Sequence, residues 1–324
     1  MTQKFKVLVT RKWPSSVEKI LEDSFDVTLN ESDVPLTDDQ LLEAINNYDA
    51  VLPTVTDNVS DKIISSSNRK AKIIGNFGVG FNNIDIESAK NNGVVVTNTP
   101  EVLTDCTADI AMLLLLGVSR RASEGEFHVR KKEWSGWRPT HMMGTKVTGK
   151  TLGLVGMGRI AQAVAHKAHF GFNMKILFFD PYFNNNDIIK KFNALPCKAI
   201  DDLLENSDFV SLHCPSTDET KGLINIKTLT KMKKSSYLIN TARGDVVVEN
   251  DLVKALETGL IKGAGLDVFE GEPNVNPKLL DFKNVFLLPH LGSATEETRE
   301  AMGMRVFSNI RDFFDGKEPM DRVV

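Results

Sequence analysis

Three polar residues in the C-terminal half of the chain, Arg243, Glu272 and His290, each follow an apolar run. The guanidinium of an arginine is always charged and offers a fork of donors, which suits holding a carboxylate and polarising a carbonyl. Histidine titrates near neutral pH and can therefore give a proton to a carbonyl oxygen. A glutamate can hydrogen-bond the other ring nitrogen, and its negative charge is expected to raise the pKa of that histidine.

A glycine-rich turn follows the strand-like run Thr151–Val155 and leads into a helical pattern that extends through His169. Gly156 permits a tight turn, Gly158 lets the backbone approach a pyrophosphate, and Ala161 lets the helix pack against the strand. The helix N-terminus then offers free N–H groups to the phosphates. This is a G-x-G-x-x-A dinucleotide fingerprint, made of Gly156, Met157, Gly158, Arg159, Ile160 and Ala161.

The position of Asp180 supports the interpretation of the glycine turn as a dinucleotide site. Asp180 ends the next strand-like run, 180 − 158 = 22 residues after the second glycine. At this spacing a carboxylate accepts hydrogen bonds from the adenine ribose hydroxyls. Taken alone, Asp180 would be a turn residue before Pro181.

Eleven apolar runs alternate with helical patterns, and such alternation predicts parallel sheets and two α/β domains. The helical pattern after Arg120 is followed by a long connection up to Lys150. In an open α/β sheet, ligands bind beyond the carboxyl ends of strands, so Arg243, Glu272 and His290 are expected to share one crevice. Taken singly, they would be a surface cation, a loop acid and a buried histidine. The runs are Phe5–Thr10, Phe25–Leu29, Ala50–Val55, Lys72–Phe77 and Val94–Thr97, then Thr151–Val155, Lys175–Phe179, Asp208–Leu212, Ser236–Asn240, Ala264–Val268 and Val285–Leu288.

Composition excludes several classes of protein. With 39 Lys and Arg against 43 Asp and Glu, the net charge is −4, which disfavours a nucleic-acid-binding surface. The longest apolar stretch, Ile110–Val118, is too short to span a bilayer. Three cysteines without a CxxC pair suit a reducing compartment, and we expect a cytoplasmic protein. His166 and His169 lie three apart on a helix but lack an evident third ligand, so no metal is expected.

The glycine fingerprint and the segments around the three polar residues, in this order, resemble the D-isomer-specific 2-hydroxyacid dehydrogenases over nearly the whole chain. These segments are Leu238–Gly244, Leu266–Pro273 and Leu288–Thr295. The resemblance implies an α/β fold with two Rossmann-like doubly wound parallel-sheet domains. A coenzyme domain at 103–291 would be inserted into a substrate domain made of 1–102 and 292–324.

The resemblance also implies roles for individual residues. Arg243, Glu272 and His290 would be catalytic. The loop Phe77–Asp85 would present the N–H groups of Val79 and Gly80 to a substrate carboxylate, although it also reads as a turn before a helix. Asp267 would accept from the nicotinamide carboxamide or cap a strand end, and Thr107 would lie near the cofactor or hold its own helix. The expected cofactor contacts are Thr107, Gly156, Gly158, Arg159, Ile160, Asp180, His213, Cys214, Pro215, Thr241, Ala242, Arg243, Asp267, His290 and Gly292.

Within the family, Trp134–Gly144 resembles the glyoxylate and hydroxypyruvate reductases, which include glycerate dehydrogenases, and the 2-ketogluconate reductases. We therefore expect reduction of glyoxylate or hydroxypyruvate to a D-2-hydroxy acid, with NADH preferred over NADPH. The alternatives are 2-ketogluconate reduction, phosphoglycerate or formate oxidation, and an NAD-dependent regulatory binding protein. A homodimer is expected. Trp137 would close the substrate pocket of the neighbouring subunit, or else pack in an interface or in the core.

Overall fold

The computed structural model describes residues 4–324, which form two compact units. The first contains the described residues up to Leu103 together with Ala294–Val324, and the second contains Thr104–Ser293. These divisions lie one and two residues from the boundaries expected after residues 102 and 291. The second unit is thus a continuous segment, whereas the first is assembled from both ends of the chain.

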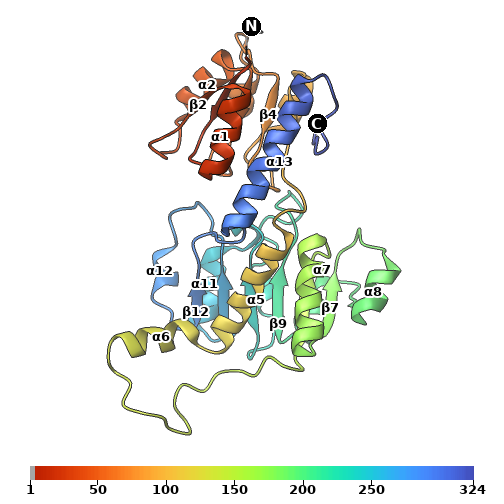
Figure 1. The fold of residues 1–324 in the computed structure, drawn as a ribbon. Coiled ribbons are helices and arrows are strands. Elements are labelled where there is room, and N and C mark those ends of the chain that lie inside the picture. The colour runs from red at the N-terminus through yellow and green to blue at the C-terminus, as the bar shows by residue number, and fades with distance from the viewer. Residues whose placement is uncertain (1–3) are drawn as a thin grey trace. The chain divides into compact units, whose positions relative to one another are not determined.

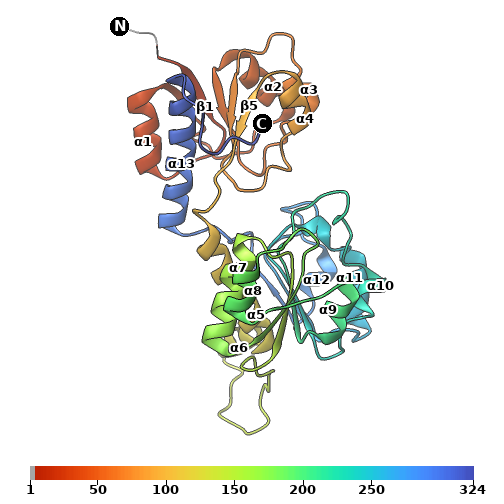
Figure 2. The same cartoon turned by 90° about the vertical axis from the view of Figure 1, so that its right-hand side faces the viewer.

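The first unit is built on a five-stranded parallel sheet in the order β2-β1-β3-β4-β5. Helices α1 and α13 pack together on one face, and α2, α3 and α4 cover the other (Figure 2). The strands are β1 Lys6–Val9, β2 Asp26–Leu29, β3 Ala50–Leu52, β4 Ile73–Gly75 and β5 Val95–Thr97. The helices are α1 Ser15–Ser24, α2 Asp38–Asn47, α3 Asp61–Ile64, α4 Ile86–Asn91 and α13 Glu296–Phe314.

The second unit is built on a seven-stranded parallel sheet in the order β12-β11-β10-β9-β6-β7-β8. Strand β6 is the first strand of this sheet along the chain. Strands β7 and β8 are added on one side of it, and β9, β10, β11 and β12 on the other, so the strand order reverses between β6 and β9. The strands are β6 Thr151–Val155, β7 Lys175–Phe179, β8 Leu195–Pro196, β9 Phe209–Leu212, β10 Tyr237–Asn240, β11 Gly263–Leu266 and β12 Val285–Leu287.

One apolar core lies under α5 and α7, and a second lies on the other face under α9, α10 and α11. Helix α5 approaches β11 so closely that a Cβ on Gly265 would stand 2.9 Å from the Cβ of Leu114, which explains the glycine there. The helices are α5 Thr104–Ser119, α6 Ala122–Arg130, α7 Arg159–His166, α8 Asn186–Phe192, α9 Ile200–Asn206, α10 Ile226–Leu229, α11 Glu249–Glu257 and α12 Pro277–Leu280, with η1 Lys167–Gly171 and η2 Gly244–Val246 as short π and 3₁₀ turns.

The expected fold class is confirmed: both sheets are parallel, and each of the eleven expected strands is present. Most strands are shorter than expected, as with β3, which ends at Leu52 rather than Val55. Strand β8, a two-residue edge strand that contains Pro196, was not expected from the sequence. Such a strand has almost no periodicity, and proline is tolerated only where no ladder hydrogen bond is needed. Between residues 4 and 324 no helix is long and apolar enough to cross a membrane.

Candidate active site

The expected polar residues of the second unit gather along one edge of its sheet, because all seven strands run in the same direction. The glycine turn follows β6, Asp180 follows β7, His213 follows β9, Arg243 follows β10, and His290 follows β12. This edge includes the point between β6 and β9 where the strand order reverses, which is where open α/β sheets bind ligands.

His290 and Glu272 form the core of the site. The Nδ1 atom of His290 lies 2.8 Å from Oε2 of Glu272, and the two side chains are each one-third exposed. A carboxylate only accepts hydrogen bonds, so Nδ1 carries the proton and Nε2 faces away from Glu272. The second carboxylate oxygen of Glu272, Oε1, accepts the N–H of Phe269 at 2.9 Å. The carboxylate is therefore held from two sides.

Electrostatics keep Glu272 ionised. Burial raises the pKa of the Glu272 carboxyl, but the hydrogen bond and charge of His290, the Phe269 N–H and the charge of Arg243 outweigh it and hold that pKa below its ordinary value. Glu272 therefore stays negatively charged across the neutral range, beside the histidine that would gain or lose a proton.

The backbone of the His290 loop is held by a buried acid. Asp267 is 1 % exposed, and its carboxylate accepts the N–H groups of Leu291 at 2.6 Å and Gly292 at 2.8 Å. Burial raises the pKa of Asp267 despite these two hydrogen bonds. On the other side of the loop, the Thr107 hydroxyl donates to the carbonyl of Gly292 at 2.8 Å. Both side chains thus support the histidine, and a cofactor contact by either one remains a prediction.

Arg243 stands on the turn after β10 and is partly buried. Its Nη1 donates to the carbonyl of Ala242 at 2.6 Å, and burial lowers the pKa of the guanidinium although Glu272 and Asp245 raise it. The Asn240 amide closes the turn by donating to the Arg243 carbonyl at 2.9 Å. Immediately beyond it, a Cβ on Gly244 would lie 2.0 Å from the carbonyl carbon of Phe269, so only glycine lets this turn pack on the segment that carries Glu272.

The glycine turn has the geometry that its sequence predicts. Gly156 has φ +89°, in the region that favours glycine, and its backbone packs against the peptide joining His213 and Cys214. A Cβ on Gly158 would meet nothing within 4 Å, so the backbone there faces open space at the N-terminus of α7. Ala161 is fully buried, as close packing of helix and strand requires.

Asp180 is tied to the glycine turn as well as to its own. Its Oδ2 accepts the N–H of Met157 at 2.8 Å and its Oδ1 accepts the N–H of Tyr182 at 3.0 Å. Asp180 is therefore a turn residue, as the interpretation of this residue taken alone expects. Each carboxylate oxygen retains a further lone pair that can accept a ribose hydroxyl.

Two further features of this edge suit a bound nucleotide. The hydroxyl of Thr241 is buried and has no hydrogen-bond partner within the described chain, although buried polar groups are normally paired. His213 is held at Nε2 by the Ser211 hydroxyl, at 2.9 Å, and burial lowers the pKa of the imidazole to about 4. Burial also raises the pKa of the neighbouring Cys214 thiol to about 11. An uncharged imidazole and thiol suit packing against a ligand rather than acid–base work.

Comparison with known proteins decides the family. The family model described as D-isomer specific 2-hydroxyacid dehydrogenase, NAD binding domain, matches residues 112–292. The chain belongs to the D-isomer specific 2-hydroxyacid dehydrogenases. It is 45% identical to a glyoxylate reductase from Thermococcus litoralis, over 98% of this chain and 96% of that protein.

Two other relatives are also similar along their whole length. This dehydrogenase is 38% identical to a glycerate dehydrogenase from Hyphomicrobium methylovorum, over 97% of this chain and 98% of that protein. A solved NADPH-dependent glyoxylate/hydroxypyruvate reductase from Sinorhizobium meliloti, in complex with NADP and malonate, superposes with a TM-score of 0.86 at 31% identity, covering 99% of this chain and 97% of the other. The family model supports NAD(H) binding by this dehydrogenase.

Trp137 of this dehydrogenase lies on the long connection between α6 and β6, which Figure 1 shows projecting from the second unit. Its side chain is 81% exposed, and Trp134 on the same connection is 54% exposed. The interpretation of Trp137 as core packing within its own chain is therefore wrong. A place in an interface or in a neighbour's pocket requires a second copy.

The loop after β4 belongs to the first unit. Asp85 begins α4, because its carboxylate accepts the N–H of Ser88 at 2.9 Å, as the simpler interpretation of the loop predicts. Val79 and Gly80 lie ahead of this helix, in a bend whose carbonyl groups accept hydrogen bonds from asparagine side chains. A turn before a helix and a carboxylate-binding loop are therefore compatible interpretations, because Asp85 begins the helix whereas Val79 and Gly80 lie in the preceding bend.

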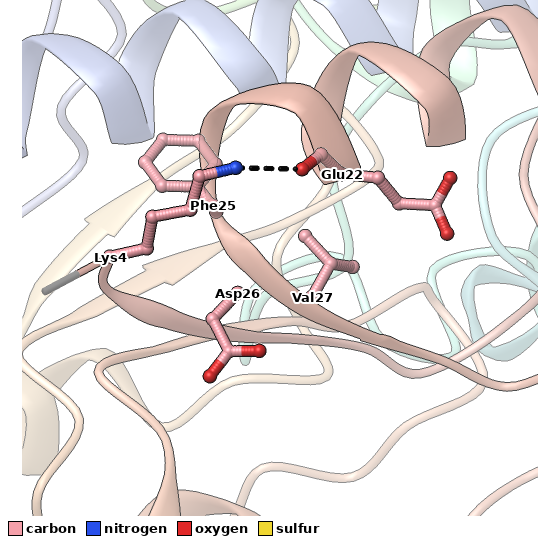
Figure 3. Close-up of a pocket in the computed structure, with 5 residues that line it drawn as sticks. All are labelled: Lys4, Glu22, Phe25, Asp26 and Val27. Atoms are coloured by element: carbon pink, nitrogen blue, oxygen red, sulfur yellow. Dashed lines mark hydrogen bonds between the residues drawn. The ribbon is translucent and has the colours of Figure 1, made fainter. Parts of the chain in front are cut away.

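A separate hollow of 490 Å³ lies at the β2 edge of the first sheet (Figure 3). Its one ammonium group, that of Lys4, donates to the carbonyls of Glu22 and Asp23 at 3.1 and 2.8 Å and so ends α1. None of Arg243, Glu272 and His290 lines this hollow, and we do not assign it to the active site.

Several residues that support the site were missed from the sequence. Asn240 closes the Arg243 turn, and the Gln162 amide donates to the carbonyl of Met157 at 2.9 Å within the glycine turn. Asn76 and Asn98 hold the bend with Val79 and Gly80. Each of the three asparagines ends or follows an apolar strand run, a position where a polar side chain is a detectable signal.

Proposed function

We propose that this dehydrogenase reduces glyoxylate and hydroxypyruvate to the corresponding D-2-hydroxy acids with NADH. The observation that carries the proposal is the 2.8 Å contact of His290 with Glu272, at the same sheet edge as the glycine turn. The named activities of the similar glyoxylate reductase and glycerate dehydrogenase support this choice of substrates.

Arg243, Glu272 and His290 would have separate roles in the reaction. When bound, NADH supplies the hydride that adds to the carbonyl carbon. The imidazolium of His290 gives the proton on Nε2 to the carbonyl oxygen, and Glu272 stabilises the positive ring from the Nδ1 side. Arg243 binds the substrate carboxylate and polarises the carbonyl, which its partly buried guanidinium does more strongly than a fully solvated one.

The second unit would be the coenzyme domain and the two-part first unit the substrate domain. We assign the pyrophosphate to Gly156, Gly158, Arg159 and Ile160 at the start of α7. Thr241 would give its unpartnered hydroxyl to the cofactor, with Ala242 beside it. His213, Cys214 and Pro215 would line the nucleotide, and Thr107, Asp267 and Gly292 the nicotinamide end.

Cofactor choice would depend on Asp180. Its carboxylate would accept from the ribose hydroxyls of NADH and repel the 2′-phosphate of NADPH. The Sinorhizobium relative is NADPH-dependent, so the shared fold does not by itself set this preference. A preference for NADH of at least about tenfold needs only about 1.4 kcal/mol.

A homodimer would cover the apolar surface of α6 and its connection. Phe127, Val129, Trp134, Trp137 and Met143 are each more than half exposed there. A cluster of large apolar side chains in water marks an interaction site. In the dimer Trp137 would close the substrate pocket of the neighbouring subunit and favour small acids. The three free cysteines support a cytoplasmic location.

A second candidate, 2-ketogluconate reduction, is favoured by the polar residues beside Trp137. Arg138 and His141 lie on the same connection and could pair the hydroxyls of a longer sugar acid. Hydroxyls left unpaired when buried cost about 1–3 kcal/mol each. We rank this substrate after glyoxylate and hydroxypyruvate.

The test is kcat/KM for glyoxylate, hydroxypyruvate, 2-ketogluconate and pyruvate, with NADH and with NADPH. A preference for 2-ketogluconate would reverse the ranking, and cofactor binding without turnover would indicate a regulatory protein instead. The panel is repeated in Trp137→Ala, with Trp134→Ala as the matched control and light scattering to report the oligomer. An unchanged substrate ratio in Trp137→Ala would leave Trp137 as an interface residue only.

A further inference from the structure

Three successive carbonyl groups in the bend after β4 are held by the side chains of two asparagines. The Gly78 carbonyl accepts Nδ2 of Asn76 at 3.2 Å and the Thr99 N–H at 3.0 Å. The Val79 carbonyl accepts Nδ2 of Asn98 at 2.8 Å. The Gly80 carbonyl accepts the same Asn76 amide at 2.9 Å. Hydrogen bonds therefore fix the directions of all three carbonyl groups.

The direction of each carbonyl determines that of the next N–H group. A trans peptide is planar, and its N–H points opposite to its C=O. The N–H of Val79 therefore points away from Asn76, and the N–H of Gly80 points away from Asn98. Within residues 4–324 neither of these N–H groups donates a hydrogen bond. Both remain as donors for a ligand.

Asn76 is itself locked. It is fully buried, and its Oδ1 accepts Nδ2 of Asn83 at 3.3 Å. Asn83 donates further to the carbonyls of Thr54 at 3.0 Å and Asp57 at 3.2 Å, both beyond the end of β3. With its oxygen engaged by Asn83, the amide of Asn76 presents its NH₂ group to the bend. A chain of side-chain amides thus connects β3, β4 and the bend.

We propose that Asn76 and Asn98 are positioning residues that aim the N–H groups of Val79 and Gly80 at the carboxylate of the 2-keto acid. This inference rests on the proposed reduction of 2-keto acids, whose carboxylate the N–H groups of Val79 and Gly80 are expected to bind. If either peptide rotated, a carbonyl oxygen would replace an N–H donor and would repel the carboxylate. Hydrogen bonds to charged groups are among the stronger ones, so their loss weakens binding markedly.

The test compares Asn98→Ala with Asn92→Ala. Asn98 is partly exposed and donates one hydrogen bond from its side chain to the bend. Asn92 is also partly exposed and donates to the Ser88 carbonyl at 2.9 Å, away from the bend, so it controls for a general loss of stability. Asn76→Ser is a second variant, because its hydroxyl is too short to bond both carbonyls. The probes are glyoxylate and oxamate, which carries a carboxylate beside an unreactive carbonyl.

We expect Asn98→Ala to raise the KM for glyoxylate and the Kd of oxamate for the enzyme–NADH complex by about tenfold. The Kd of NADH, measured by fluorescence, should change less than about twofold, and Asn92→Ala should leave all three constants unchanged. Asn98→Ala with native KM and oxamate Kd would overturn the proposal, even if Asn76→Ser fails to fold. If the native enzyme binds oxamate but does not reduce glyoxylate, the proposed substrate is wrong while the oxamate comparison still decides the role of Asn98. A native enzyme that neither binds oxamate nor reduces any 2-keto acid overturns both.

Discussion

The buried carboxylate of Asp267 accepts the backbone N–H of Gly292 at 2.8 Å, two residues after the histidine of the active site. It accepts the N–H of Leu291 as well, and the Asp267 carbonyl accepts the N–H of His290 at 2.9 Å. His290 has φ +56°, a left-handed conformation that costs roughly 1–2 kcal/mol for a residue with a Cβ. The acid therefore holds His290 in a backbone conformation that it would not adopt by itself.

Removal of the proton donor should mainly affect the chemical step. We expect His290→Ala to lower kcat for glyoxylate by roughly 10²–10⁴-fold, the usual contribution of one positioned acid. The Kd of NADH should change little. His166→Ala, on α7 and packed on Phe170, is the matched control. Near-native turnover in His290→Ala would remove this residue from the mechanism.

The charge of Glu272 should shape the pH profile. Its pKa lies below the ordinary value, so the carboxylate is present above that value and is lost only as the pH falls through its folded pKa. From pH 5 to 8 Glu272 stays ionised beside Nδ1 of His290. In Glu272→Gln this charge is absent at every pH, so kcat for glyoxylate should be lower, and a loss of rate as the pH falls through the folded pKa of Glu272 should be absent from the variant. A variant with the native kcat and the native acid limb of the pH profile would contradict this role.

Arg243→Lys keeps the charge but loses the planar fork of donors, and we do not expect a mild effect. The KM for the keto acid should rise and kcat should fall, because one group both holds the carboxylate and polarises the carbonyl. Arg311→Lys, on the surface of α13, serves as the control. Steady-state kinetics in both substrates give the measurement. If only the affinity for NADH suffers, Arg243 is a nucleotide contact alone.

Asp180→Ser should narrow the preference for NADH over NADPH, since the carboxylate that repels the 2′-phosphate is gone. It should also weaken binding of both cofactors, because Asp180 accepts the Met157 N–H of the glycine turn. Asp180→Asn separates these effects: it removes the charge and keeps an acceptor for the turn. The measurement is kcat/KM for each cofactor. A native enzyme that uses NADPH as well as NADH would show that Asp180 does not face the ribose.

The neutral imidazole of His213 predicts a loss of stability in mild acid. Its pKa falls to about 4 in the folded state, so between about pH 4 and 6.5 the unfolded chain binds more protons. Stability is therefore lost as the pH falls through this window, by at most about 2 kcal/mol from pH 7 to 5 for a partly buried group. Urea unfolding without cofactor measures it. His213→Gln should lose less stability over the same interval, and an equal loss would assign the effect to other groups.

Much of the active site was predictable because each reactive residue follows its own strand. Apolar runs, glycines and the spacing to Asp180 are local properties of the chain, and parallel strands bring their carboxyl ends to one edge whatever their order. Arg243, Glu272 and His290 could therefore be assigned to one crevice from the sequence. The direct contact of His290 with Glu272 follows from this arrangement, because the elements that carry them end at the same edge.

What only the tertiary structure decided is which polar groups are engaged with one another. The Thr107 hydroxyl reaches the Gly292 carbonyl across 185 residues, and no periodicity encodes such a pairing. Asp180 and Asp267 were recognised as acids at strand ends, but their bonds to the glycine turn and the His290 loop depend on strands that meet only in the folded sheet. The same holds for Asn76, whose amide direction depends on Asn83 and the end of β3. Sequence determines the kinds of group at the sheet edge, and packing determines their directions, because a hydrogen bond depends on angles that only the assembled elements set.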